Sequence, residues 1–508
     1  MSKFQDNKSP IMIKKYLISA VFCIVCGFSF SQSEITAFTA TGRGGAATTF
    51  VTDYQSLGIN PSNLGWKSPF NDHIVSIGLI EGAYSVYSEA LAKPDLKESI
   101  TNFESEKFTY QEKVDAAQAF TEAGFAINVD LSLFAIAVQP NEKVGGFAFG
   151  IRERIQWYSI FNKTISDILF MGYNADYFTS LLLDDGNIIP KTDSVQQLIE
   201  SGDTSLINNV AEGLIDPIQA KLFSVLLKGS RISLSWYREY NFSYGRKIVS
   251  NDNFSLFGGI GLKYLTGMAI LDVRAENSEL EAFSAITPIL DINYGDSAIA
   301  QTSPVEQTGN LPKSVGAGYG FDIGFSAIIK EKLKIGFAVN DIGSITWDGN
   351  VFVANDNFLM DMSSAGFGSY NLFQEAEDIV GENGVIKWDG ITEKKTNLPT
   401  NIRAGASFQP SDKFEAGIDL IIPANDVAGN YKKMLFAFGL DVKPIPWLRL
   451  STGITTGGNY GFNLPAGIAI ILGEGTWEAG VASRDAITFF TENRPTLSLS
   501  AGFLRFRF

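Results

Sequence analysis

Hydrophobic residues alternate with small or polar residues along several stretches of the chain. In residues 144–158, one face carries Phe147, Phe149, Ile151, Ile155 and Trp157, and the other carries Gly146, Ala148, Gly150, Arg152 and Arg154. Residues 314–329 and 434–443 repeat this pattern. A period of two residues is typical of a β-strand with two different faces. The alternation alone fits both a soluble sandwich and a membrane barrel. The lengths of the connections between strands distinguish these two folds.

We predict about fourteen strands from this pattern, an even number, as expected for single-chain bacterial barrels. They lie near residues 72–87, 123–139, 144–160, 230–249, 254–272, 314–330, 333–347, 399–409, 412–424, 431–443, 446–457, 460–472, 475–487 and 495–508. After the N-terminus, the sequence has no apolar run of about 18 residues that would form a membrane helix. The predicted fold class is all-β, a transmembrane antiparallel β-barrel.

The connections between these strands sort by length. Short turns fall at residues 140–143, 250–253, 330–332, 410–413, 443–446 and 473–475, all on one rim. The long segments at residues 88–122, 161–229, 273–313 and 348–398 fall on the other rim, followed by shorter loops. Short periplasmic turns opposite long extracellular loops are typical of outer-membrane barrels.

Two long loops have helix-like spacing. These are residues 105–120 and 194–228, where Leu206, Val210 and Leu214 recur at helical intervals and Pro217 is the expected break. The spacing favours a packed external loop, and a lid or a partner-docking helix is the alternative.

The N-terminus resembles a secretory signal peptide. Lys14 and Lys15 precede an apolar run from Tyr16 to Phe30, and Ser29-Phe30-Ser31 offers a cleavage site. We therefore predict that residues 1–31 are removed, with an uncleaved anchor as the alternative; either Met1 or Met12 could be the start. Cys23 and Cys26, the two cysteines of the chain, fall in this segment, so a mature chain would have neither thiols nor disulfides.

Composition excludes several functional classes. The formal net charge of −15, without any basic block, argues against nucleic-acid binding. His73 is the single histidine, so together with the lost cysteines the usual zinc sites, thiol nucleophiles and histidine-based triads are excluded. We expect no enzyme, since no set of nucleophile, base and orienting group is recognisable; an outer-membrane enzyme is the remaining alternative.

A glycine-rich stretch and an Asn-Pro motif precede the first strand. Gly42, Gly44 and Gly45 would let the backbone turn tightly in a crowded lumen, with a flexible tail as the alternative. Asn60 and Pro61 begin Asn60-Pro61-Ser62-Asn63-Leu64. Together these resemble the start of FadL-type outer-membrane barrels, with Ser62 at a position where Ala is common.

The resemblance continues at residues 258–264 and at residues 339–343, which are followed by Trp347. Such strings are similar to those of FadL-like and PorV-like proteins of Bacteroidota. The resemblance implies a fourteen-stranded barrel with a plug or hatch in its lumen. The expected domains are therefore a signal peptide at 1–31, a plug at 32–70 and a barrel at 71–508.

Charged residues on the predicted lumen face are candidates for binding the head group of a substrate. They are Arg152, Arg154, Lys263, Asp322, Asp419 and Asp441, and the alternative is that they pair across a filled lumen. Acidic loop residues could hold Ca²⁺, although no EF-hand spacing is present; these are Asp184, Asp185, Asp193, Asp356 and Asp361. Otherwise no cofactor or metal is expected.

The chain ends in Leu504-Arg505-Phe506-Arg507-Phe508. The alternation sends Phe506 and Phe508 toward lipid and both arginines inward, and it resembles the signal read by barrel-assembly machinery. Leu497 and Leu499 have the opposite phase, so we predict a β-bulge near Ala501-Gly502.

Two functions remain open. The FadL resemblance implies uptake or passage of small hydrophobic molecules: capture by external loops, passage past the hatch, and a lateral or periplasmic exit. The PorV resemblance implies a non-enzymatic accessory subunit of a secretion or assembly complex. The expected partners are outer-membrane lipid, the barrel-assembly machinery and other outer-membrane or periplasmic proteins, but no nucleic acid.

Overall fold

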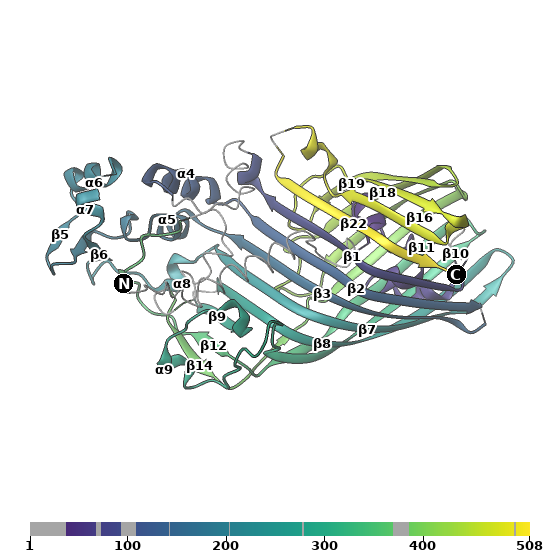
Figure 1. The fold of residues 1–508 in the computed structure, drawn as a ribbon, viewed down its shortest axis with the longest axis horizontal. Helices are drawn as coiled ribbons and strands as arrows, with labels where there is room; N and C mark the ends of the chain where they lie inside the picture. The colour runs from purple at the N-terminus through teal and green to yellow at the C-terminus, as the bar shows by residue number, and fades with distance from the viewer. Residues whose placement is uncertain are drawn as a thin grey trace, which may run out of the picture.

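The computed structural model describes residues 37–67, 73–92, 108–141, 143–202, 204–276, 279–368, 381, 386–491 and 494–508. Fourteen antiparallel strands close into a barrel, because each pairs with the next and β22 (Thr496–Arg507) pairs back with β1 (Val75–Ser88) (Figure 1). The others are β2 (Phe125–Asn141), β3 (Gly145–Ile160), β7 (Arg231–Asn251), β8 (Phe254–Glu276), β10 (Gly316–Ile329), β11 (Leu333–Trp347), β16 (Asn401–Ser411), β17 (Phe414–Pro423), β18 (Leu435–Ile445), β19 (Leu448–Gly457), β20 (Ala466–Leu472) and β21 (Trp477–Ser483). The predicted fold class is confirmed.

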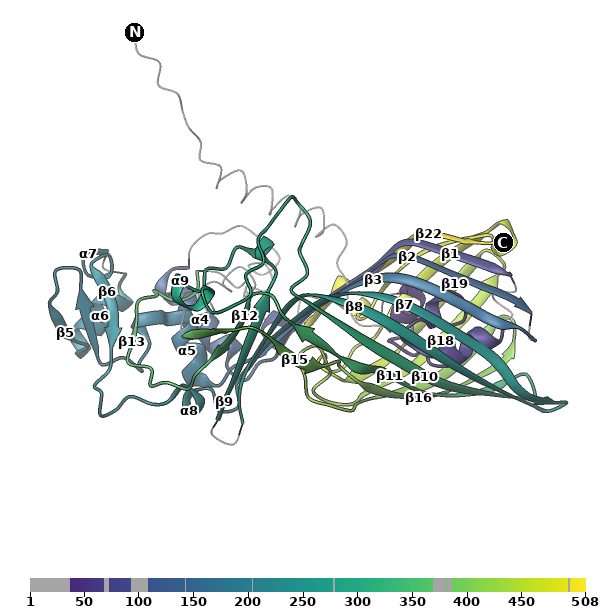
Figure 2. The same ribbon diagram turned by 90° about the horizontal axis from the view of Figure 1, so that it is seen from below.

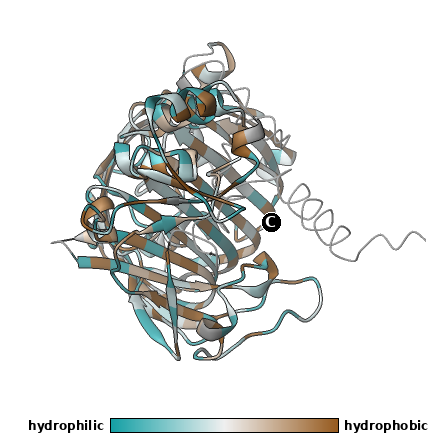
Figure 3. Ribbon diagram, turned by 90° about the vertical axis from the view of Figure 1, so that its left-hand side faces the viewer, coloured by the Kyte–Doolittle hydropathy of each residue, from teal (hydrophilic) through white to brown (hydrophobic). Residues whose placement is uncertain are grey.

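The outer wall carries a belt of exposed apolar side chains, as lipid requires. Examples are Ile260 and Leu262 on β8, Phe321 and Phe325 on β10, and Phe436 and Phe438 on β18. Figure 3 shows the alternation of hydrophobic and hydrophilic residues along the strands.

An aromatic girdle marks the outer edge of this belt. The ring of Tyr264 lies 6.0 Å from that of Tyr240 and 5.4 Å from that of Tyr319, measured between centroids. Farther along β7, Arg238 pairs with Glu153 of β3 on the same outer face. Since an ion pair is not suited to hydrocarbon, we infer that the belt ends between Tyr240 and Arg238.

The two rims differ as predicted. Short turns connect β2 to β3, β7 to β8, β10 to β11, β16 to β17, β18 to β19 and β20 to β21 at one rim. At the other rim, long segments follow β1, β3, β8 and β11.

The long segments build an external cap, shown at the left of Figure 2. Helices α4 (Tyr110–Phe120), α5 (Lys163–Met171) and α8 (Phe223–Leu226) share one apolar core with the outward-facing side chains of β7 and β8 beyond the girdle, such as Leu234 and Leu271. A small sheet of β4 (Ser180–Leu183), β5 (Ile188–Pro190), β6 (Val210–Leu214) and β13 (Asp361–Met362) completes the far end. Among the described residues, no helix has the length and apolar character needed to cross a membrane.

The helical prediction for the cap is right for part of the chain and wrong for another part. Helix α4 lies in the first predicted segment, and α6 (Asp193–Glu200) and α7 (Thr204–Ile207) lie in the second. Val210 and Leu214, however, belong to strand β6. The reason is tertiary: β6 pairs with β4 on one side and β13 on the other, and such pairing overrides a short periodic pattern.

Residues 37–66 form a plug inside the barrel, seen in purple in Figure 2. It contains α2 (Phe38–Gly42) and two short 3₁₀ turns, η1 (Asp53–Ser56) and η2 (Pro61–Gly65). Every plug residue in this range is buried except Gln55 and Leu57, which are partly exposed. The predicted signal peptide at residues 1–31 lies outside the described residues.

Candidate functional site

The Asn-Pro motif docks the plug onto the barrel wall. The side chain of Asn60 accepts a hydrogen bond from the amide of Ser62, which caps η2, and its Nδ2 donates to Ser326 Oγ at 3.0 Å. The carbonyl groups and side chains of this turn lie against Gly245, Gly259 and Gly324 of the wall. A Cβ at any of these glycines would meet Asn60 or the backbone of Pro61, so glycine is required for the close approach.

The glycine-rich stretch lies against the opposite part of the wall. Gly44 and Gly45 have positive φ angles of 69° and 94°, and Gly42 packs against the backbone of Gly467 on β20. The carbonyl of Gly44 accepts a 2.7 Å hydrogen bond from Thr455 Oγ1. The glycines therefore form a tight turn in contact with the barrel.

Two of the predicted lumen carboxylates hold the plug. Asp441 pairs with Arg43 at 2.7 Å and accepts a hydrogen bond from Ser451 at 2.6 Å. Asp419 accepts hydrogen bonds from the amides of Ala47 and Thr48 and from the Thr48 hydroxyl, at 3.0, 2.8 and 2.6 Å. Both carboxylates are buried, so each is compensated by plug donors rather than by water.

The other four predicted residues form a separate ionic cluster on β3, β8 and β10. Lys263 pairs with Asp322 at 2.8 Å and with Asp341 at 2.6 Å. Arg154 bridges Asp341 and Glu239 at 3.1 and 3.2 Å, and Arg152 pairs with Glu239 at 3.0 Å. All these side chains are buried, and the cluster ties five neighbouring strands together on the lumen side.

Sequence reasoning missed several acidic partners. Glu81 accepts hydrogen bonds from Tyr54 Oη at 2.5 Å and from Arg505 Nη2 at 2.9 Å. Glu478 pairs with Arg507 at 2.6 Å and with Arg449 at 2.9 Å. The alternation along β21 could have revealed that Glu478 faces the lumen, since Gly480 and Ala482 lie on the same inward face. The position of Glu81 could not be found in this way, because the alternation of buried and exposed residues along β1 shifts at Ile80, whose φ is 50°.

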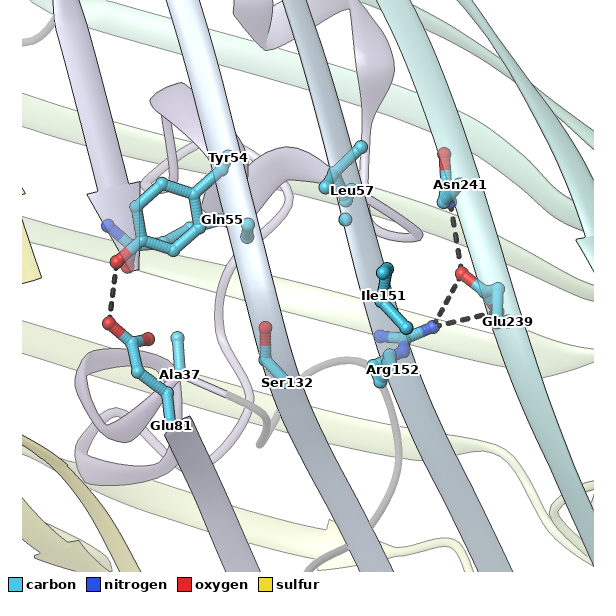
Figure 4. Close-up of a pocket in the computed structure, with 12 residues that line it drawn as sticks. Ala37, Tyr54, Gln55, Leu57, Glu81, Ser132, Ile151, Arg152, Glu239 and Asn241 are labelled. Atoms are coloured by element: carbon cyan, nitrogen blue, oxygen red, sulfur yellow. Dashed lines mark hydrogen bonds and ion pairs between the residues drawn. The ribbon is translucent and has the colours of Figure 1, made fainter. Parts of the chain in front are cut away.

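Beside α2 and η1, the plug leaves little free volume within the barrel, whereas a wider pocket of about 740 Å³ lies at the short-turn rim beside Leu64 and Trp66. One cavity of about 40 Å³ lies between the plug and β1, β2 and β3, and its lining includes Leu57, Glu81 and Ser132 (Figure 4). Another of about 30 Å³ lies on the other side, beside Arg43 and Arg507. Each of these two small cavities has room for no more than a few water molecules.

The wall beside the first cavity is irregular, with β-bulges on β2 and β22 and a gap in the pairing of β1 between them. Leu79 of β1 pairs with Leu504 and the next aligned pair is Gly82 with Ala501, so the pairing has a gap at Ile80 and Glu81 while the register stays the same. On β2 the register with β3 skips Leu133, which lies beside Ile80. Between β21 and β22, one extra residue of β22 lies between Gly502 and Arg505. The predicted bulge near Ala501-Gly502 is therefore present, displaced to Phe503-Leu504.

The C-terminal strand has the predicted orientation. Arg505 and Arg507 are buried in the lumen, whereas Phe508 is exposed and Phe506 is partly exposed on the outer wall. The role of Phe506 and Phe508 in barrel assembly stays a prediction.

The acidic residues considered as Ca²⁺ ligands are spread over the cap. Two of them, Asp356 and Asp185, accept hydrogen bonds from protein groups. Asp356 accepts hydrogen bonds from the amide and hydroxyl of Ser224, and Asp185 accepts one from the amide of Asn187. Asp361 lies in β13 and Asp193 opens α6. Calcium binding stays a prediction.

The chain is similar to solved structures with which it shares little sequence identity. The toluene transporter TodX of P. putida is 8% identical with a TM-score of 0.42, over 94% of this chain and 99% of that chain. A Pseudomonas aeruginosa FadL homologue is 12% identical with a TM-score of 0.37, over 94% and 99%. The CymD monoaromatic hydrocarbon channel is 12% identical with a TM-score of 0.32, over 94% and 99%. No curated protein matches the chain.

One protein family matches the sequence over residues 201–476, more than half of the 508 residues. Its description is "Family of unknown function (DUF5723)". The match spans β7 to β20 and includes Lys263, Asp322, Asp419 and Asp441. The chain therefore belongs to this family of unknown function, DUF5723.

Proposed function

We propose that the protein lies in the outer membrane of a Gram-negative cell and passes small hydrophobic molecules from the outside into the membrane. The observation that carries the proposal is a row of irregular pairing in the lipid-facing wall, where a gap at Ile80 is flanked by β-bulges at Leu133 and Phe503-Leu504, backed by a cavity in the lumen. The transported molecules leave through this part of the wall rather than along the barrel axis.

The axis is an unfavourable route for an apolar molecule. At the level of the plug the interior is ionic, and the plug is fixed by buried pairs such as Arg43 with Asp441 and by the Asn60 contacts. Breaking one buried pair costs about 3–5 kcal/mol, and a moving plug has to break several. A route that leaves the plug in place avoids this cost.

The wall at the bulges is the favourable alternative. Backbone groups in a lipid-facing wall are normally all paired, because an unpaired group costs several kcal/mol in hydrocarbon. Ile80 has no aligned partner on either neighbouring strand, although the register is the same on both sides of this gap, so fewer cross-strand hydrogen bonds have to break for the wall to part there. Ile80 is 56% exposed toward lipid, while the next residue, Glu81, lines the cavity.

A disulfide across this seam tests the proposal. Leu79→Cys with Leu504→Cys would join β1 to β22 at aligned positions beside the bulge, where paired residues are close enough to bridge. The probe is N-phenyl-1-naphthylamine, whose fluorescence rises as it enters lipid, added outside vesicles that contain the protein. We expect the oxidised variant to transfer it about tenfold more slowly, which is about 1.4 kcal/mol in barrier height, and reduction to restore the rate.

The matched control joins the same two strands farther from the bulge. Tyr84→Cys with Leu499→Cys is also an aligned pair of β1 and β22, and its oxidation is expected to leave the rate unchanged. Unchanged transfer in the oxidised Leu79–Leu504 variant, or equal slowing by both pairs, would contradict passage through this seam. Transfer no faster than in protein-free vesicles would contradict transport itself.

A further inference from the structure

The loop between β17 and β18, residues 424–434, folds back into the mouth of the barrel. Ala428 and Tyr431 are buried, Ala428 against residues of the upper lumen such as Tyr237, and Tyr431 among side chains that include Phe50 of the plug. Gly429 comes so close to the wall that a Cβ there would lie 2.5 Å from Ser235 Oγ and 2.8 Å from Gln156 Oε1. The loop thus covers the inner face of β3 and β7 above the plug.

One carboxylate on the rim holds this loop down. Asp426 pairs with Arg231 of β7 at 2.6 Å, with Arg274 of β8 at 3.4 Å and with Lys432 at 2.5 Å. Its side chain is 54% exposed, so these pairs compete with water and salt. These pairs form a latch of modest strength at the outer edge of the loop, in addition to hydrogen bonds from Asn425 Nδ2 to the Leu398 carbonyl at 2.8 Å and from Asn430 Nδ2 to the Thr400 carbonyl at 3.0 Å.

The wall beneath the loop carries a row of buried polar side chains. Aligned pairing runs from Ser498 to Ser85, Asn128, Gln156 and Ser235 across β22, β1, β2, β3 and β7. In the part of the chain that the structure describes, the Oγ atoms of Ser85 and Ser235, Asn128 Nδ2 and both amide atoms of Gln156 have no hydrogen-bond partner. Such groups are normally satisfied in native proteins, so a whole row of them points to a missing water or ligand.

A buried cation lies at one end of this row. Arg484 directly follows β21, and its amide donates to Ser498 Oγ at 3.3 Å. The residue is 1% exposed, and its guanidinium lies 3.9 Å from the centre of the Tyr460 ring. None of its three guanidinium nitrogens has a hydrogen-bond partner among the described residues. A buried cation without a counter-charge is unfavourable, and an anion beside it would remove the penalty.

We propose that the row from Arg484 to Ser235, here called the polar row, is a binding site for a small water-soluble oxyanion, and that residues 424–434 are its lid. When the lid is closed, the loop covers the row; when it opens, the row is accessible to water and to a ligand. Because the latch favours closure and the unpaired row favours opening, the loop is poised between two states. This site is distinct from the wall seam, so either proposal can fail alone.

Charge-selective labelling of a cysteine tests the site in the full-length protein. In a Cys23→Ser/Cys26→Ser background, Ser85→Cys is reacted with methanethiosulfonates carrying either a sulfonate or a trimethylammonium group. With Arg484 within reach of the thiol, we expect the sulfonate reagent to react about 10³-fold faster than the trimethylammonium reagent, because a unit charge at roughly 8 Å and an effective dielectric constant near 20 attracts the anion and repels the cation. Arg484→Gln should abolish the preference, and Arg484→Lys should keep it.

The ligand is tested by protection in the same assay. Inorganic phosphate and acetate represent the two common sources of an oxyanion, and either should slow the labelling of Ser85→Cys at a saturating concentration. Protection by phosphate alone assigns the site to phosphate-type ligands, and protection by acetate assigns it to carboxylates. Protection by neither, or a charge preference that survives Arg484→Gln, would overturn the site.

The lid is tested by opening the latch. Asp426→Asn removes the charge that holds the loop and should raise the labelling rate of Ser235→Cys by about tenfold, the factor that about 1.4 kcal/mol represents. Asp412→Asn, on the exposed turn at the other rim, is the matched control and should leave the rate unchanged. Equal rates in Asp426→Asn and the parent, with barrel folding checked by heat-modifiable gel migration, would overturn the lid.

Discussion

Asp419 offers the sharpest test of how the plug is held. One oxygen of this buried carboxylate accepts three hydrogen bonds from Ala47 and Thr48 of the plug, and Arg403 of β16 donates a fourth at 3.3 Å. In Asp419→Ala all four donors lose their acceptor, and the Arg403 charge stays buried. Few single changes in the lumen remove as many contacts between plug and wall.

The expected cost follows from these contacts. A hydrogen bond to a charged group contributes about 1.5–3 kcal/mol, and removing one partner of a buried pair costs about 3–5 kcal/mol. Since the individual values are not additive, we take about 3–5 kcal/mol as the loss for Asp419→Ala. Local opening of this part of the plug should therefore become about 10²–10³ times more frequent.

Amide hydrogen exchange measures this opening directly. The amides of Phe50 and Val51 bond to the carbonyl of Ala47 inside the plug, so their exchange reports opening without involving Asp419 itself. We expect a rise of about 10²–10³-fold in Asp419→Ala, a smaller rise in Asp419→Asn, and none in the exposed control Asp412→Ala. Exchange in Asp419→Ala within about threefold of the parent protein would refute the idea that this carboxylate fixes the plug.

Two further predictions follow from local geometry. Gly259→Val places a side chain against the backbone of Pro61 and Ser62 and should destabilise the docked plug by about 1–3 kcal/mol. The plug should then become protease-sensitive at a lower urea concentration. Gly258→Ala, whose side chain would face outward beside Ile248, is the control and should leave that concentration unchanged. In the cap, Thr109 caps α4 and hydrogen bonds from its side chain and amide lower the pKa of Glu112 below the ordinary 4.5; Thr109→Ala should weaken α4 by about 1 kcal/mol. Because the carboxylate form of Glu112 accepts these hydrogen bonds, its contribution to the stability of α4 is complete above pH 4.5 and disappears as the pH falls through the lowered pKa. Amide hydrogen exchange over residues 110–120 should therefore differ between Thr109→Ala and the parent protein more at pH 7 than at pH 3.

The barrel could be predicted from the sequence because its two faces meet two different solvents. Lipid on one side and a crowded lumen on the other impose a period of two on every strand, and this period survives in single segments such as residues 144–158. The inward orientation of Arg152, Lys263 and Asp441 followed from the same alternation, and the structure places each of them in the lumen. The separation of short turns and long loops onto opposite rims could be predicted from the positions of the strands alone.

The partners of these residues could not be predicted in the same way. Which carboxylate meets which cation depends on register between strands distant in sequence and on the path of the plug, as with Arg43 and Asp441. The alternation along β1 also shifts locally at Ile80, and this hid Glu81. In the cap, Val210 and Leu214 fitted a helix in isolation and became a strand only through pairing with β4 and β13.

The distribution of unpaired groups indicates where the molecule can move. Around the plug, the charges of Arg43, Asp419 and Asp441 are all compensated, so displacing the plug exposes several charges at once. Above the plug, several side chains of the polar row are unpaired beneath a loop that is held by the partly exposed pairs of Asp426 and by hydrogen bonds of Asn425 and Asn430, so the proposed opening there would hydrate groups that are unfavourably buried. The free-energy difference between these regions favours a plug that stays in place while the outer mouth opens. Under the proposed function, a molecule admitted there would meet a closed axis, and the gap in pairing at Ile80 would be the exit of lowest cost.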